Sequence, residues 1–251
     1  MLYIVKMGGK LIEDEFLLDT FLKNFHMLRG SKILIHGGGA DASVLSKRLG
    51  LYTKIVEGRR ITNTKTLEVL VMIYAGLLNK EIVASLQTLG TNGIGLSGVD
   101  GKLLCSFSRS VKFIDYGYVG DFNKKSVNIK YVYSLIQLKF VPVFCAITYD
   151  NKGNLLNTNA DTIASYIAIT MSEIEEISLH YCFEKKGILR NLEYANSYYT
   201  IINFVNIEYF RNGMLPKLEN AFYALKKGVR KVSLGNPYSL IRVKDKTLLY
   251  L

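Results

Sequence analysis

Two glycine clusters near the start of the chain each follow a short apolar segment. Gly8 and Gly9 end the run VKMGG, and Gly37, Gly38 and Gly39 follow the run ILIH. Glycine lets the backbone approach an anion closely, and consecutive N–H groups at the start of a helix favour negative charge. Taken singly, either cluster is also typical of a tight strand-to-helix turn. Together, at neighbouring strand ends, they predict a grip on both sides of a transferred phosphoryl group.

Three charged residues occupy positions that favour a shared site. Lys6 closes an apolar strand beside the first glycine pair, where a buried lysine is costly unless it is paired. Lys217 stands near a helix start in GMLPK, where the helix dipole disfavours a cation and a nearby anion would relieve it. Asp161, in NTNAD, is expected to enter the same crevice and orient the lysines, although this segment is also typical of a helix N-cap.

Arg60, in EGRRIT, offers a two-pronged donor for a carboxylate. The G-x-G-x-x-G match from Gly93 to Gly98 is interpreted as accidental, because its glycines lie inside an expected strand and a turn follows. The sequence has no Walker-type phosphate loop and no Cys/His spacing typical of zinc, so no protein-held metal is expected.

The elements that must position these residues alternate along the chain. Strands are expected at 2–7, 33–35, 94–96, 141–147, 177–182, 232–234 and 248–251, with a glycine-rich β region at 102–121. Helices are expected at 14–28, 41–49, 64–89, 126–139, 160–171, 206–211 and 216–227. This alternation predicts an α/β fold with a mostly parallel sheet covered by helices on both faces, and a ligand site at the carboxyl ends of its strands.

Composition narrows the functional classes. A chain of 251 residues that is 49% hydrophobic and 21% charged is long enough for a sizeable core and is not disordered. No continuous apolar run approaches a membrane span and the start does not resemble a signal peptide, so a cytoplasmic protein without membrane contact is expected. Three widely spaced cysteines suit a reducing compartment. The net charge of +11 is spread without a long basic block, which favours scattered lysines over nucleic-acid binding.

Eight motifs then occur in an order that resembles the N-acetylglutamate kinases of the amino acid kinase superfamily. They are VKMGGK, LIHGGGA, EGRRIT, AGLLNKEI, GLSGVDG, DYGYVGD, LNTNADTIA and GMLPK, and they cover nearly the whole chain. The resemblance implies an open, mainly parallel sheet sandwiched between helices, as in carbamate kinase. It implies that residues 1–172 form the acylglutamate-binding lobe and 173–251 the ATP-binding lobe. The implied reaction is ATP-dependent phosphorylation of the side-chain carboxylate in arginine biosynthesis.

The resemblance also implies roles residue by residue. Lys6 and Lys217 would stabilise the transferring phosphoryl group, and Asp161 would hold both lysines. The nucleophile is already a carboxylate, so no general base is needed, and Mg²⁺ would arrive with the nucleotide. The remaining implied contacts are Gly8, Gly9, Gly37, Gly213 and Met214 to phosphates or ATP, and Gly38, Gly39, Arg60 and Asn157 to the acyl-amino acid, with Arg60 on the α-carboxylate.

Departures from the family pattern leave alternatives open. The expected nucleotide segment reads HYCFEKKGI, in which Glu184 replaces the usual aspartate, so ATP placement is less defined than the chemistry. The same kinase acting on N-succinylglutamate is one alternative, and a catalytically silent binding protein is another. The chain enters its first strand at once, without the extra N-terminal helix of arginine-inhibited hexameric relatives. A homodimer that arginine does not inhibit is therefore expected, with the apolar helix around 67–78 as its interface.

Overall fold

A central sheet of eight strands organises the chain, in the order β12-β14-β13-β11-β1-β2-β8-β5. The computed structural model describes residues 1–56, 58–111, 113–190, 197–204, 214–242 and 246–251. Every neighbouring pair is parallel except β13 and β14. The strands are β1 (Leu2–Met7), β2 (Lys32–His36), β5 (Gly93–Leu96), β8 (Val141–Cys145), β11 (Ile177–Cys182), β12 (Ile201–Asn203), β13 (Lys231–Gly235) and β14 (Thr247–Tyr250).

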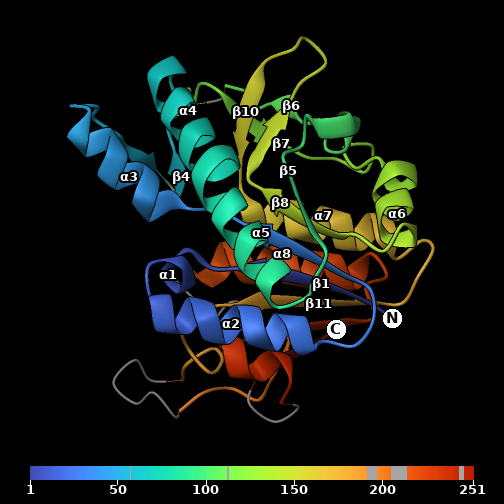
Figure 1. Cartoon of the computed structure of the whole chain (residues 1–251). Helices are drawn as coiled ribbons and strands as arrows, with labels where there is room; N and C mark the ends of the chain where they lie inside the picture. Colours follow the sequence, from blue (N-terminus) through green and yellow to red (C-terminus); the bar gives the residue numbers. More distant parts are fainter. Residues whose placement is uncertain (57, 112, 191–196, 205–213, 243–245) are drawn as a thin grey trace.

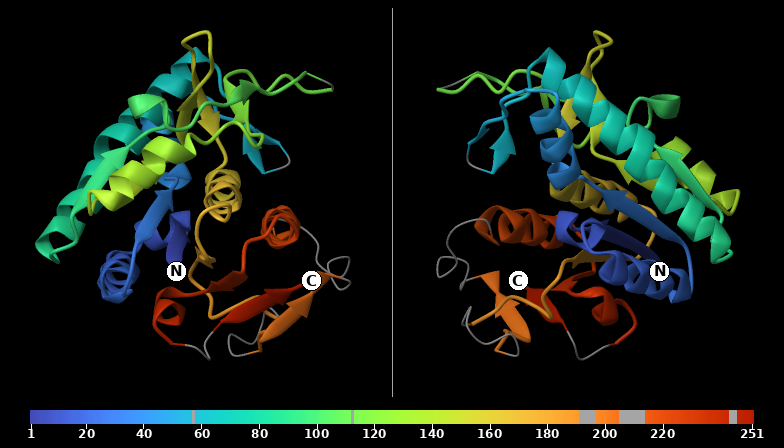
Figure 2. Two further views of the ribbon diagram at one scale, coloured as in Figure 1. Left: turned by 90° about the vertical axis from the view of Figure 1, so that its right-hand side faces the viewer. Right: turned by 60° about the vertical axis from the view of Figure 1, so that its left-hand side comes forward.

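Helices cover both faces of this sheet. In β1, Leu2 and Ile4 join the larger core beneath α6, α7 and α8, whereas Val5 and Met7 join the smaller core beneath α1, α2 and α5. Figure 2 (left) looks along the axes of α7 and α8, which lie side by side. The helices are α1 (Gly9–Ile12), α2 (Glu15–Met27), α3 (Gly39–Arg48), α4 (Thr64–Leu70), α5 (Asn79–Thr88), α6 (Ile129–Gln137), α7 (Ala160–Met171) and α8 (Leu215–Lys226).

A second, smaller sheet stands at the upper end of the molecule in Figure 1, with the order β6-β7-β10-β9. It consists of β6 (Phe107–Ser108), β7 (Val119–Asp121), β9 (Ile147–Tyr149) and β10 (Leu155–Thr158), and a separate hairpin pairs β3 (Ile55–Val56) with β4 (Arg59–Arg60). The sequence pattern did not predict β3, β4, β10 or β12, because elements of two to four residues carry too little periodicity. The strand expected at 141–147 divides at Ala146 into β8 and β9.

The helix expected at 64–89 is continuous from Thr64 to Thr88, but its middle turns, η1 (Val71–Leu78), are π-helical. Among the described residues it is the one helix long and apolar enough to cross a membrane, with a mean hydropathy of 1.6 over its most apolar window. The sequence has no unbroken apolar run of this length, so the run length alone did not indicate this helix. That window is 44% buried against the protein's own core, and the remaining apolar face is open.

The remaining expectations from the sequence have different outcomes. Gly93–Leu96 is a strand followed by the short turn η2 (Asp100–Lys102), so the G-x-G-x-x-G match does not open a helix. The helical turn expected at 206–211 lies outside the described residues. The division between 172 and 173 stays a prediction, and the central sheet crosses it, because β1 pairs with β11. A short 3₁₀ turn, η5 (Pro237–Leu240), completes the elements.

Candidate active site

A cavity of about 270 Å³ opens where the carboxyl ends of β1 and β2 meet the second sheet and the β3–β4 hairpin. Its wall combines glycines, three cations and one carboxylate, which suits a small anionic ligand. The lining residues are Lys6, Gly9, Gly37, Gly38, Gly39, Ile55, Gly58, Arg59, Arg60, Tyr74, Val119, Ala146, Asn157, Thr158, Asn159, Ala160 and Asp161.

Lys6, Asp161 and Lys217 come together from three different elements; Lys6 and Asp161 line the cavity, and Lys217 reaches Asp161 from outside its lining. Asp161 Oδ1 lies 2.9 Å from Lys6 Nζ at the end of β1, and Oδ2 lies 3.5 Å from Lys217 Nζ in the first turn of α8. All three side chains are less than one-fifth exposed. Two cations and one anion leave the group with one unit of positive charge.

The pKa values of this group reflect burial and mutual attraction. Burial alone would raise the pKa of Asp161, but Lys6 and Lys217 outweigh it and lower that pKa to about 2. Burial lowers the pKa of Lys6, because Asp161 offsets only part of the desolvation and Lys217 adds repulsion. A negatively charged ligand would offset part of the desolvation cost of Lys6.

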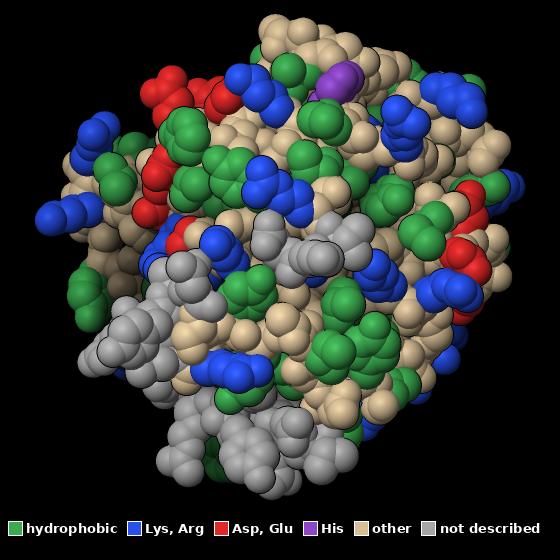
Figure 3. Space-filling model, turned by 90° about the horizontal axis from the view of Figure 1, so that it is seen from below, with side chains coloured by type: hydrophobic (Ala, Val, Ile, Leu, Met, Phe, Trp, Pro, Cys, Tyr) green, Lys and Arg blue, Asp and Glu red, His purple; other side chains and the backbone are tan. Residues whose placement is uncertain are grey.

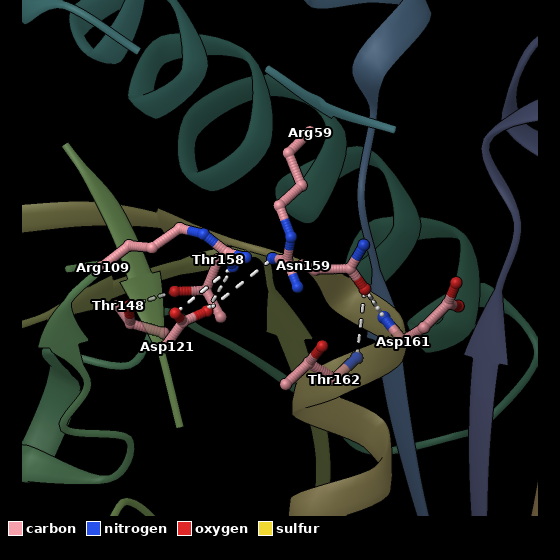
Figure 4. A network of polar contacts seen from close by, with 8 residues as sticks. All are labelled: Arg59, Arg109, Asp121, Thr148, Thr158, Asn159, Asp161 and Thr162. Carbon is pink, nitrogen blue, oxygen red and sulfur yellow. Dashed lines mark hydrogen bonds and ion pairs between the residues drawn. The ribbon is translucent and has the colours of Figure 1, made fainter. Parts of the chain in front are cut away.

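The start of α7 fixes Asp161. Asn159 is the N-cap, and its Oδ1 accepts hydrogen bonds from the backbone N–H of Asp161 at 2.8 Å and of Thr162 at 3.1 Å (Figure 4). The N-cap interpretation and the crevice interpretation of the NTNAD segment therefore both hold. An acidic residue in the first helical turn is also favoured by the helix dipole.

The glycine clusters lie at two neighbouring strand ends, as their positions predicted. A Cβ atom at Gly9 or Gly37 would meet open space, so packing does not require glycine there. Gly38 is different, since its φ of 149° suits glycine and a Cβ would collide with Leu78 and lie 3.1 Å from Tyr74. Gly8 lies behind the cavity wall, where its N–H donates to the Cys182 carbonyl at 2.8 Å.

Arg60 is buried beside the second glycine cluster. Its Nη2 donates to the Gly39 carbonyl at 3.0 Å and to Ser43 Oγ at 2.7 Å. Its Nη1 is buried without a hydrogen-bond partner in the described chain, and a ligand carboxylate would satisfy it. Asn157 also lines the cavity and donates from Nδ2 to Thr62 Oγ1 at 3.1 Å.

Sequence reasoning identified Arg59 only as a substitute for Arg60, and it missed the basic group that Arg59 forms with Arg109 and Asp121 beside the cavity. Arg109 Nη1 lies 2.9 Å from Asp121 Oδ1, and Arg59 Nη1 lies 3.8 Å from the same oxygen (Figure 4). Burial lowers the pKa of Arg59, Arg109 adds repulsion, and Asp121 offsets part of the effect. The available signal in the sequence was that Arg59 is adjacent to Arg60. In the structure both arginines line the cavity.

The structure describes only some of the residues that were predicted to lie on the nucleotide side. Gly213 lies outside the described residues, and Met214 is the N-cap residue of α8, half-buried against the larger core. Glu184 lies 3.4 Å from Lys10 Nζ at the surface.

In the described parts of the chain, no three His, Cys, Asp or Glu side chains gather to hold a metal. Among the described residues, Asp161 is the one that contributes a carboxylate to the cavity lining, and each of its two oxygens lies near a lysine. This donor set does not fit a metal held by the protein.

The chain is similar to several known proteins over most of its length. A model of the amino acid kinase family matches residues 1–236. Acetylglutamate kinase of Phocaeicola vulgatus is 46% identical over 237 residues, covering 92% of this chain and 91% of that protein. Acetylglutamate kinase of Cytophaga hutchinsonii is 42% identical over 249 residues, covering 96% and 94%. The structure of carbamate kinase from Giardia lamblia bound to AMP-PNP shares the fold, with a TM-score of 0.67 at 10% identity over 99% and 98% of the two chains.

Proposed function

The chain belongs to the amino acid kinase family, and we propose that its cavity transfers the γ-phosphoryl group of ATP to the 5-carboxylate of N-acetylglutamate. The chain has the activity of an acetylglutamate kinase. The roles of its individual residues are what we propose. The observation that carries them is the Lys6–Asp161–Lys217 group, held against two glycine clusters with one positive charge in excess.

The proposed chemistry is positioning and charge neutralisation. Lys6 and Lys217 face the negative charge that develops on the transferring phosphoryl oxygens, and Asp161 holds both ammonium groups in place. Gly9 and Gly37, which line the cavity, supply close backbone approach to the phosphates. Gly8 does not take the phosphate-donor role expected from the sequence, because its N–H is bonded to the Cys182 carbonyl outside the cavity lining. The acceptor is a carboxylate that needs no deprotonation at neutral pH, so no side chain acts as a base.

The acyl-amino acid is proposed to lie against Gly38, Gly39, Arg60 and Asn157. The unpartnered Nη1 of Arg60 supports a contact with its α-carboxylate. This assigns the acylglutamate to residues 1–172 and the ATP to 173–251, with Gly213 and Met214 on the nucleotide side and Mg²⁺ carried by the phosphates.

One observation favours N-succinylglutamate as a second candidate substrate. Arg59 lines the same cavity, and its neighbouring carboxylate, Asp121, is already paired at 2.9 Å with Arg109. Two arginines around one aspartate leave a positive charge that a succinyl carboxylate would neutralise. Arg59→Met should then lower kcat/KM for N-succinylglutamate more than for N-acetylglutamate.

We propose a cytoplasmic homodimer that contacts neither membrane nor nucleic acid. The open face of the long helix presents Met72 and Leu77, each about half exposed, to a second copy. On the face seen in Figure 3, Lys and Arg are scattered among apolar and neutral side chains. Light scattering should give twice the chain mass for the wild type and a monomer for Met72→Glu. A monomeric wild type would contradict the assembly.

The test of function is ADP release with N-acetyl-, N-succinyl- and free glutamate. Turnover with an acylated glutamate and none with free glutamate supports the proposal, and the ratio of the two acyl substrates decides between them. No turnover with any of the three would favour a silent binding protein.

A further inference from the structure

A buried polar pair lies directly behind the second glycine cluster. His36, the last residue of β2, is fully buried, and its Nε2 lies 3.0 Å from Nδ2 of Asn79, the first residue of α5. The other ring nitrogen, Nδ1, lies 2.8 Å from the carbonyl oxygen of Gly37. Burying two polar side chains is costly unless each hydrogen bond is made, so this arrangement needs a reason.

The direction of each hydrogen bond follows from one fixed acceptor. Asn79 Nδ2 also lies 2.9 Å from the carbonyl oxygen of Val143, in the neighbouring strand β8. A carbonyl oxygen can only accept, so the Asn79 amide must present its NH₂ group here and donates its second hydrogen to His36. His36 Nε2 is then the acceptor, and Nδ1 carries the proton that goes to Gly37.

The same stretch of the long helix touches the glycine cluster twice. The Asn79 N–H bonds to the Tyr74 carbonyl, the i→i+5 spacing of a π turn. Tyr74 and Leu78 leave no room for a Cβ at Gly38, while Asn79 holds His36. The π-helical turns thus bring packing contacts and a hydrogen bond to one loop.

The consequence concerns the peptide between Gly37 and Gly38. In a planar trans peptide the carbonyl and the following N–H point in opposite directions. Because the Gly37 carbonyl is turned inward to His36, the Gly38 N–H is turned away from the imidazole. Both glycines line the cavity, so a Gly38 N–H that points away from the buried imidazole points toward the cavity.

We propose that His36 and Asn79 are positioning residues that fix the Gly37–Gly38 peptide for phosphoryl transfer, with the imidazole held neutral as the Nδ1–H tautomer. This inference rests on the proposed function of the cavity. Burial lowers the pKa of His36 to about 4, which agrees with a neutral ring. His36 therefore takes no part in proton transfer.

The first test is spectroscopic and needs no turnover. In ¹⁵N-labelled wild-type protein the His36 ring, assigned through its own backbone resonances, should stay neutral from pH 8 to pH 5.5 with its proton on Nδ1. The assignment is needed because burial also lowers the pKa of His180, to about 3, so a second ring stays neutral in this range. His36→Asn should remove the His36 signal alone. An Nε2–H tautomer, or protonation of this ring within that range, would overturn the inference. Because this arm uses the wild type, it stands even where a variant fails to fold.

The second test separates positioning from stability. His36→Leu should lower kcat by about 10²-fold, with a smaller change in KM for the acylglutamate, because the loop loses its anchor. His36→Asn keeps a donor near the Nδ1 position and should retain at least about tenfold more kcat than the leucine variant. Folded His36→Leu with wild-type kcat, or an asparagine variant no better than leucine, would refute the positioning role.

Asn24→Leu is the matched control. Asn24, on α2, is another buried polar side chain, which donates from Nδ2 to the Pro237 carbonyl at 3.1 Å away from the cavity lining. Its replacement should reduce stability and leave kcat per folded molecule unchanged. If the wild type shows no turnover, the result counts against the proposed function. If the wild type is active but His36 is the Nε2–H tautomer, or His36→Leu has wild-type kcat, the result counts against this inference alone.

Discussion

Replacing Lys217 by methionine removes one charge from the candidate site while keeping an apolar stem of similar length. The Lys217 ammonium lies 3.5 Å from Asp161 Oδ2 and 5.8 Å from the centre of the Phe183 ring. Methionine preserves the contact with that ring. The side chain is 18% exposed, so water supplies little of the lost interaction.

The magnitude has two sources in the structure. A unit charge about 4 Å from developing negative charge is worth about 4 kcal/mol at an effective dielectric constant of about 20. Loss of one preorganised transition-state contact typically costs about 3–4 kcal/mol, a fall of about 10²–10³-fold in kcat. In addition, Asp161 would then neutralise Lys6 alone, so the charge of the group falls from +1 to zero.

The assay is steady-state ADP release at saturating ATP with N-acetylglutamate varied. We expect kcat to fall by about 10²–10³-fold while KM for N-acetylglutamate changes by less than about threefold, because the contact acts on the transition state. Lys226→Met is the matched control, since Lys226 is an exposed lysine in the last turn of the same helix. A Lys217 variant with kcat within about twofold of wild type would refute the role argued here.

Three further predictions use other parts of the molecule. Arg60→Ala should raise KM for the acylglutamate by about tenfold or more, since a charged hydrogen bond contributes about 1.5–3 kcal/mol; an unchanged KM, also in the double variant with Arg59, would contradict it. Lys32→Met should lower the free energy of unfolding in urea by about 2 kcal/mol, because Nζ bonds three carbonyls at the end of α2 at 2.7–3.1 Å; an unchanged midpoint would exclude this. Asp161 has a pKa of about 2 in the fold against 3.8 ordinarily, so it adds about 2 kcal/mol of stability above pH 4 that is lost as the pH falls through 2. Acid titrations should therefore be flatter for Asp161→Asn, and identical pH profiles would argue against the pairing.

Much of the fold and part of the candidate site could be predicted because local patterns carry them. The strand β1 is short and apolar and carries Lys6 one residue before its end, where an unpaired lysine would be costly, so the sequence predicts a partner. Asn159 and Asp161 follow N-cap chemistry, which fixes a helix start from a few residues. Both arguments use neighbours along the chain, and the structure brings Asp161 to Lys6 and Lys217.

Contacts between distant segments could not be predicted in the same way. Arg109 and Asp121 meet Arg59 across more than forty residues, through strands too short to show a period. The hydrogen bond between His36 and Asn79 depends on a π-helical register that no residue preference in Val71–Leu78 indicates. Such sites depend on tertiary packing, and sequence alone identifies their residue types but not their partners.

The charges of the cavity explain why these costs are tolerated. Lys6 is desolvated, Lys217 faces the unfavourable end of a helix dipole, and Arg60 keeps a buried nitrogen without a partner in the described chain. None of the three arrangements favours the fold by itself, and together they offer an uncompensated positive field. Phosphate oxygens and a substrate carboxylate would satisfy all three at once. The free energy that these three arrangements cost the fold is therefore available, on binding, to stabilise the charge that develops during transfer.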